Sequence, residues 1–145
     1  MLLLVTGLFA FLALQQTQVE RARGEARAAA DQKVVELLSY DHRTIATDIG
    51  ARMALLTGQF KEDYGALLRD VVIPAATQQQ LTTRSSVVSS SVAGDDGIDQ
   101  VQVVMFLNQT TQSSASPDPT LSGSRLHVTM EKKDGDWLVA ELTPV

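Results

Sequence analysis

The sequence predicts an α+β protein, in which an apolar N-terminal helix leads into one small domain of three helices and a curved four-stranded antiparallel sheet. Three features predict this: an uncharged apolar N-terminus, apolar residues at helical spacing up to Pro74, and β-branched residues with frequent turn signals from Thr82 onward. A chain of 145 residues suffices for one domain with an appendage. Helices followed by strands are typical of domains whose helices cover one face of a sheet.

The composition argues against several classes of function. With a net charge of -5, the chain lacks the excess of basic residues that binding to nucleic-acid phosphates needs, so no nucleic-acid partner is expected. The absence of cysteine excludes disulfides, thiol catalysis and thiolate metal sites. The two histidines are far apart, and no carboxylates have the spacing of a calcium loop. We therefore expect neither a metal nor a cofactor.

Residues 1–14 carry no charge and are apolar on every helical face. A membrane span needs about 20 apolar residues, and residues 1–14 cover about 21 Å of a hydrocarbon core about 30 Å thick. A cleaved signal peptide would have a basic start, and a soluble core helix would have a polar face. We therefore expect residues 1–16 to be the C-terminal part of a transmembrane helix whose beginning is missing from this chain.

Residues 17–39 continue as an amphipathic helix, which we interpret as a stalk and the first helix of the domain. Its small residues leave two interpretations open: they pack on the domain's own core, or they allow close approach of a partner helix. The side chains expected to contact lipid or a partner helix are Leu4, Leu8, Phe9, Phe11, Leu12, Val19, Ala22 and Ala26.

Two further helices are expected between Asp41 and Pro74. Asp41 is an N-cap candidate for a helix with apolar residues from Ile45 to Leu56, and Gly58 follows its end. The next helix places Phe60 and Tyr64 on its apolar face as core anchors. Pro74 is expected to end or kink this helix.

Four strands are expected in residues 83–92, 99–110, 125–132 and 137–142. In the second strand Val101, Val103, Met105 and Leu107 share a face, and Phe106 lies on the other face as a further core anchor. The third strand is interpreted as an edge or half-exposed strand, after a long polar loop over residues 112–124. Asp134-Gly135 predicts a tight turn, and Trp137 after it is a core anchor whose indole N-H can reach a partner.

Several short motifs together resemble the Mce-associated membrane proteins of actinobacteria. The motifs are Ser39-Tyr40-Asp41, Leu56-Thr57-Gly58-Gln59-Phe60 with Tyr64, Phe106-Leu107-Asn108-Gln109, Arg125-Leu126-His127-Val128-Thr129-Met130, Gly135-Asp136-Trp137-Leu138-Val139 and Leu142-Thr143-Pro144-Val145. The resemblance implies that residues 40–145 form a cone similar to nuclear transport factor 2 and to VirB8. It also implies a single span that holds this domain on the outer, periplasmic side of the cytoplasmic membrane.

The resemblance further implies a non-catalytic accessory subunit of an Mce-type ABC lipid importer. Its expected partners are the transporter permease, the Mce subunits and the lipid around the span. One alternative is a scaffold subunit of a type IV secretion or conjugation apparatus. Another is a lipid-binding or isomerase domain with an enclosed pocket. The ionisable residues that an isomerase would use are Tyr40, Asp41, His42, Asp48, Tyr64 and His127. Capping accounts for Asp41, and solvent exposure accounts for His42 and His127.

Overall fold

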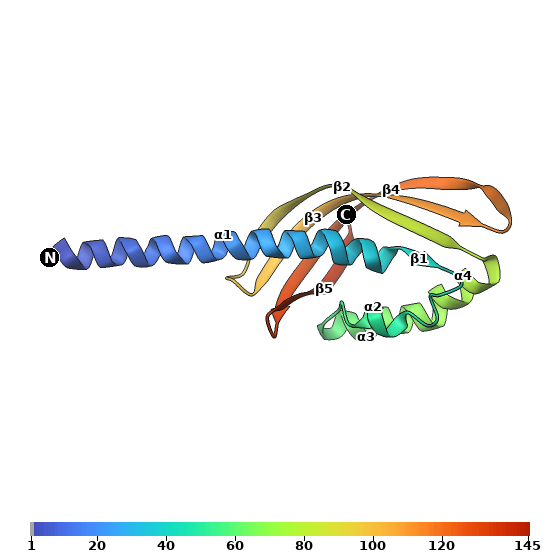
Figure 1. Ribbon diagram of the computed structural model, residues 1–145, viewed down its shortest axis with the longest axis horizontal. Coiled ribbons are helices and arrows are strands. Elements are labelled where there is room, and N and C mark those ends of the chain that lie inside the picture. Colours follow the sequence, from blue (N-terminus) through green and yellow to red (C-terminus); the bar gives the residue numbers. More distant parts are fainter. Residues whose placement is uncertain (1) are drawn as a thin grey trace.

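The computed structural model describes residues 2–145 and shows helices first and strands after, as predicted. Met1, the first residue of the expected apolar segment, lies outside the described residues. One long helix, α1 (Leu2–Leu38), leads into the two-residue strand β1 (Tyr40–Asp41). The remaining elements are α2 (Ile49–Met53), α3 (Gly58–Leu67), the π-helix η1 (Leu68–Val72), α4 (Ile73–Gln79), β2 (Thr82–Asp95), β3 (Gln100–Ser113), β4 (Ser116–Lys133) and β5 (Asp136–Pro144) (Figure 1).

The strands form one antiparallel sheet of five strands in the order β1-β2-β3-β4-β5. The prediction of four strands missed β1, because a strand of two residues shows no alternation of apolar and polar side chains. β4 lies between β3 and β5, so the interpretation of residues 125–132 as an edge strand is wrong. Their alternation is confirmed, since Leu126, Val128 and Met130 are all buried.

The predicted polar loop over residues 112–124 is wrong. β3 continues to Ser113 and β4 starts at Ser116, so this region is the far end of a long hairpin. Backbone ladders satisfy the polar groups of these strands, since β3 pairs with β2 as far as Gln112 and with β4 as far as Ser113, and the hairpin therefore forms without an apolar face. At its tip the Ser114 N-H donates to the Gln79 carbonyl at 3.1 Å, which fixes the hairpin to the end of α4.

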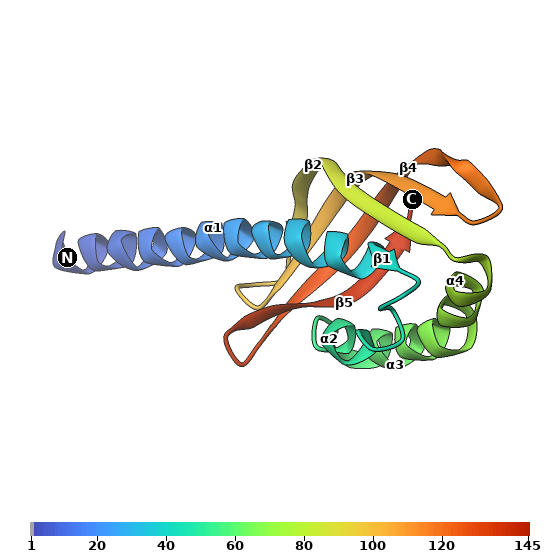
Figure 2. The same cartoon turned by 45° about the vertical axis from the view of Figure 1, so that its right-hand side comes forward.

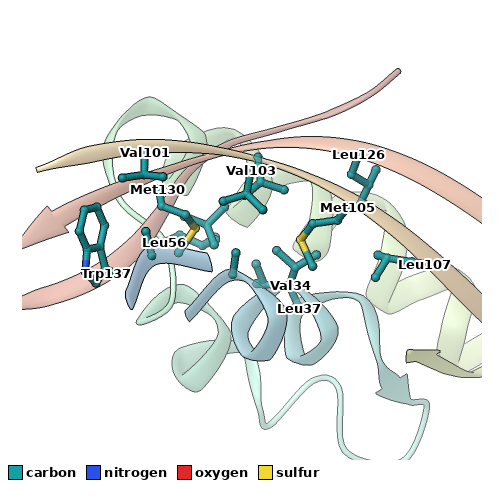
Figure 3. Close-up of a cluster of buried hydrophobic side chains, with 14 of the residues drawn as sticks. Val34, Leu37, Leu56, Val101, Val103, Met105, Leu107, Leu126, Met130 and Trp137 are labelled. Carbon is teal, nitrogen blue, oxygen red and sulfur yellow. The ribbon is translucent and has the colours of Figure 1, made fainter. Parts of the chain in front are cut away.

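The main core lies between α1 and the concave face of the sheet (Figures 1 and 3). Val34 and Leu37 of α1 point toward the strands, and Val101, Val103, Met105 and Leu107 of β3 are buried, as their alternation predicted. Ala26 and Ala30 are fully buried, and their small size allows α1 to lie close to the sheet. Aliphatic side chains thus fill the concave face.

The helices after α1 differ from the predicted pair. α2 spans only Ile49–Met53, and Ile45 is buried in the turn that precedes it. The next helix does not end at Pro74, because the π-helix η1 connects α3 to α4 and Pro74 lies in the first turn of α4. A proline is tolerated there, since the first helical turn does not need its N-H.

The four predicted core anchors occupy different environments. The rings of Phe60 and Tyr64 pack together, with centroids 5.5 Å apart, and both residues are half-buried. Trp137 is only 4% exposed, but its indole N-H has no hydrogen-bond partner, contrary to the prediction. Phe106 is 44% exposed and is not a core residue. The alternation of β3 turns Phe106 away from α1, and the helix covers only the other face.

The turn between β4 and β5 has the predicted geometry. Asp134 and Gly135 have φ angles of 51° and 83°. Two consecutive positive φ angles are what a two-residue turn of type I′ requires, and Asp-Gly is among the sequences that adopt them readily.

Candidate functional site

The N-terminal part of α1 projects beyond the sheet and leaves large apolar side chains exposed (Figures 1 and 2). These side chains, with their exposed fractions, are Leu4 79%, Val5 49%, Leu8 59%, Phe9 70%, Phe11 56%, Leu12 51% and Leu14 65%. Contiguous apolar surface of this kind marks a site that contacts another protein or a membrane. We call residues 2–14 the projecting segment.

The exposed apolar residues of the projecting segment occur at consecutive positions such as Leu8-Phe9 and Phe11-Leu12, so they face more than one side of the helix. Within the part of the chain that the structure describes, no helix combines the length and hydropathy that crossing a membrane requires.

Farther along α1, two of the residues predicted to meet a partner helix pack inside this chain instead. Ala22 and Ala26 are 5% and 0% exposed and belong to the core against the sheet. Their expected role in a partner contact is therefore wrong, and the other interpretation, packing on the domain's own core, holds. Val19 is half-buried.

The C-terminus of α1 is capped by side chains from distant parts of the chain. Arg52 donates from Nη1 to the carbonyls of Glu36 (2.8 Å) and Leu37 (3.0 Å), and from Nη2 to the carbonyl of Ser39 (2.7 Å). The Tyr64 hydroxyl also donates to the Leu37 carbonyl, at 3.0 Å. A buried cation at this end also interacts favourably with the helix dipole. α1 is therefore fixed to α2 and α3 at one point, which we call the α1 cap.

The same end of α1 carries an ion pair between Asp41 and Arg43. Arg43 Nη2 lies 2.7 Å from Asp41 Oδ2, and the Arg43 backbone N-H donates to Oδ1 at 2.9 Å. The hydrogen bond from the Arg43 side chain, followed by that from its backbone, holds the pKa of Asp41 well below its usual range. Asp41 therefore stabilises the turn after β1, rather than capping the helix that the sequence predicted there.

The ionisable residues considered for catalysis do not form one site, although His42 Nδ1 lies 3.7 Å from Asp41 Oδ1 in the turn after β1. His127 alternates with the buried Leu126 and Val128, so it lies on the outer face of the sheet, away from α1. The Tyr64 hydroxyl is bound at the α1 cap, and burial raises its pKa. His42 lies beside Thr82, with Nδ1 3.5 Å from Oγ1. Among the described residues no three His, Asp or Glu side chains are grouped so as to hold a metal.

Four hollows on the described surface are open grooves, with volumes of 250 to 380 Å³. The concave face of the sheet, where an isomerase or a lipid carrier would hold its ligand, is occupied by side chains (Figure 3). In the described residues, the face of the sheet that would hold such a ligand is therefore filled, and the hollows that are open lie on the surface of the domain.

The family profile described as "Uncharacterized protein Rv1363c/MT1408-like" matches residues 1–144. The chain belongs to this family. Among the relatives of this Rv1363c/MT1408-like chain, "Uncharacterized protein Rv1362c" of Mycobacterium tuberculosis is 37% identical over 131 residues, which cover 90% of this chain and 59% of that protein. The chain thus spans 59% of the length of that relative. "Outer membrane protein Rv1973" of the same organism is 33% identical over 124 residues, covering 86% of this chain and 76% of that protein.

Several solved structures resemble this chain in fold over most of its length. An IcmL-like type IV secretion system protein from Legionella pneumophila has a TM-score of 0.71 at 11% identity and covers 85% of this chain and 93% of its own. The periplasmic domain of DotI has a TM-score of 0.68 at 12% identity, covering 82% and 91%. VirB8 of Agrobacterium tumefaciens has a TM-score of 0.64 at 13% identity, covering 86% and 92%. At these identities the likeness shows the fold alone, and the TM-scores confirm the expected α+β class.

Proposed function

We propose that this chain is a non-catalytic accessory subunit of an envelope transport complex. The projecting segment lies in the cytoplasmic membrane, within the anchor of residues 1–16, and the domain stands on the outer side. The observation that carries the proposal is the set of large apolar side chains that the projecting segment leaves exposed. In water such a surface is costly, at roughly 25 cal/mol per Å² of apolar area, whereas lipid or a partner helix removes that cost.

The domain supports a role in binding rather than in chemistry. The ionisable side chains considered for catalysis either stabilise local structure, as Asp41 and Tyr64 do, or lie on the outer face of the sheet, as His127 does. Two of the proteins that share the fold are described as a periplasmic domain and as a type IV secretion system protein. This likeness supports a scaffold that stands outside a membrane.

We assign the complex to the Mce-type ABC lipid importers, with the permease and the Mce subunits as partners. This assignment rests on the sequence motifs that resemble Mce-associated membrane proteins, and the relatives from Mycobacterium tuberculosis agree with an actinobacterial envelope. Leu4, Leu8, Phe9, Phe11 and Leu12 form the contact with lipid or a permease helix. Val19 contributes at the end nearer the domain.

The test is affinity purification of the tagged full chain from detergent-solubilised mycobacterial membranes. The proposal expects Mce permease and Mce subunits in the eluate. Replacing Leu8 and Phe11 by Gln should remove them, while the control pair Val88→Gln and Leu121→Gln, exposed apolar residues on the domain, should retain them. Recovery of no transporter subunit by the unaltered chain would refute the assignment.

A second candidate is a scaffold of a type IV secretion or conjugation apparatus. The TM-score of 0.71 with the Legionella protein favours it. The same purification separates the two candidates, because secretion components in place of Mce subunits would identify this one.

A further inference from the structure

A small groove lies where the projecting segment meets the domain. Its volume is about 250 Å³. Its lining comes from α1, from the turn between β2 and β3, and from β4: Gln18, Arg21, Ala22, Glu25, Ile98 and Lys132. Gln18 is one helical turn beyond Leu14, a distance of about 6 Å along the axis. If the projecting segment lies in the hydrocarbon layer, the end of this groove at Gln18 is at the depth of the lipid headgroups, and the side chains of Arg21 and Glu25 extend toward it because helical side chains point toward the N-terminus.

The groove contains two cations, Arg21 and Lys132, with the carboxylate of Glu25 between them. Glu25 lies between two cations, with Arg21 Nε 3.6 Å from its Oε1 and Lys132 Nζ 3.8 Å from its Oε2. Both distances exceed the 2.7–2.9 Å typical of a charge-assisted hydrogen bond, so the cations retain donors for another acceptor. The Arg21 side chain is 80% exposed, and its planar guanidinium matches a phosphate well.

Ile98 gives this groove an apolar edge. It is 46% exposed at the tip of the β2–β3 turn, beside acidic residues that include Asp96 and Asp99. This turn lies on the side of the domain from which α1 projects (Figures 1 and 2). A large aliphatic side chain in an otherwise charged turn gains from burial at the boundary between headgroups and acyl chains.

We propose that this groove binds the headgroup of a zwitterionic phospholipid from the membrane that holds the projecting segment. The phosphate contacts Arg21 and Lys132, the ammonium group contacts Glu25, and Ile98 enters the boundary with the acyl chains. A headgroup with both charges fits because the lining has both, while Asp96 and Asp99 nearby repel a purely anionic lipid. The inference rests on the proposed membrane position of residues 1–16.

The test uses the absence of cysteine from the sequence, which makes a single introduced thiol unique. The variants Ile98→Cys, Leu121→Cys and Phe9→Cys each carry an environment-sensitive fluorophore, in the full chain reconstituted into phosphatidylethanolamine/phosphatidylcholine vesicles. Phe9 reports insertion of α1, and Leu121, 69% exposed on the far hairpin, is the control. The label at position 98 should shift to shorter wavelength and respond to a lipid-attached quencher. The label at position 121 should do neither.

Further variants test the cations. In the Ile98→Cys background, Arg21→Gln should reduce binding to the headgroup by up to about fivefold and diminish the shift, as expected for the loss of one exposed ion pair with the phosphate. Adding Lys132→Gln should abolish the shift. The matched pair Lys61→Gln and Arg69→Gln, exposed cations on α3 and η1, should leave it unchanged. None of these changes should alter the response at position 9.

The possible results separate the two levels of the proposal. A label that stays in water at position 98 while the label at position 9 is inserted overturns the headgroup site alone. A label at position 9 that stays in water overturns the membrane position, and the site with it. A shift at position 98 caused by inorganic phosphate without vesicles, or an equal shift in pure phosphatidylglycerol vesicles, overturns the zwitterionic lipid as ligand. A shift unaffected by both Gln substitutions overturns the role of the cations.

Discussion

Replacing Arg52 by Met should destabilise the domain through the α1 cap. Met has a similar length but no donors, so the carbonyls of Glu36 and Ser39 lose the hydrogen bonds of 2.8 and 2.7 Å that the guanidinium supplies. The Leu37 carbonyl retains the Tyr64 hydroxyl. A hydrogen bond to a charged group contributes about 1.5–3 kcal/mol. Two such losses at the lower end give a decrease of about 3 kcal/mol in the free energy of unfolding.

The lower end of the range for each hydrogen bond is appropriate because Arg52 is only 7% exposed, and removing its side chain also removes the cost of burying its charge. Its Nε has no hydrogen-bond partner, which adds to that cost. Arg52→Lys keeps the charge near the helix terminus but loses the planar fork, so about half of the decrease is expected. Arg69→Met, on the exposed surface of η1, is the control and should change stability by less than about 0.5 kcal/mol.

The measurement is urea unfolding of the full chain in neutral detergent, followed by far-UV circular dichroism. A lower midpoint with an unchanged slope indicates a loss of stability without a change in the surface that unfolding exposes. A decrease below about 1 kcal/mol for Arg52→Met would show that water replaces the guanidinium at little cost. The α1 cap would then not be an important source of stability.

The remaining predictions concern single side chains and use the same unfolding measurement. Tyr64→Phe should lower stability by about 1 kcal/mol because it removes one hydrogen bond, and an unchanged midpoint would contradict it. Trp137→Ala should cost about 3–5 kcal/mol, whereas Trp137→Phe should cost much less because the indole N-H has no partner. Phe106→Ala should cost less than about 1 kcal/mol, since the ring is 44% exposed, and a cost typical of a core residue would refute its placement. The pKa of Asp41 is lowered from 3.8, so its stabilising contribution is complete above that value and is lost as the pH falls below it toward the folded-state pKa. The midpoint of the native chain should therefore fall more steeply below about pH 4 than that of Asp41→Asn, and parallel profiles would contradict the ion pair.

Local patterns predicted the features that depend on neighbouring residues. The alternation from Val101 to Leu107 identified the buried face of β3, because side chains in a strand alternate between its two faces. Asp134-Gly135 identified its turn, because few other sequences accept two positive φ angles. In both cases the information lies within a few residues.

The features that the sequence did not predict depend on contacts between distant residues. Nothing in the residues around Arg52 indicates that its guanidinium reaches the end of α1, since the contacts join residues 13 to 16 positions apart. Phe106 was misassigned because strand alternation does not tell which face a helix covers. The far end of the β3–β4 hairpin is not predicted, because the polar side chains of residues 112–124 are typical of loops and backbone pairing leaves no trace in the side-chain pattern.

Because α1 is one continuous helix, the number of residues between its apolar part and the part packed on the sheet determines how the domain is rotated about the helix axis. The helix has 37 residues without interruption, or about 55 Å, and each residue turns it by about 100°. One alanine inserted between the apolar part and the part packed on the sheet would turn the domain by that angle and lift it by about 1.5 Å. Four alanines would restore the original direction to within about 40° and lift the domain by about 6 Å. An oriented partner would therefore respond to such insertions with the period of the helix, whereas a plain tether would respond to length alone.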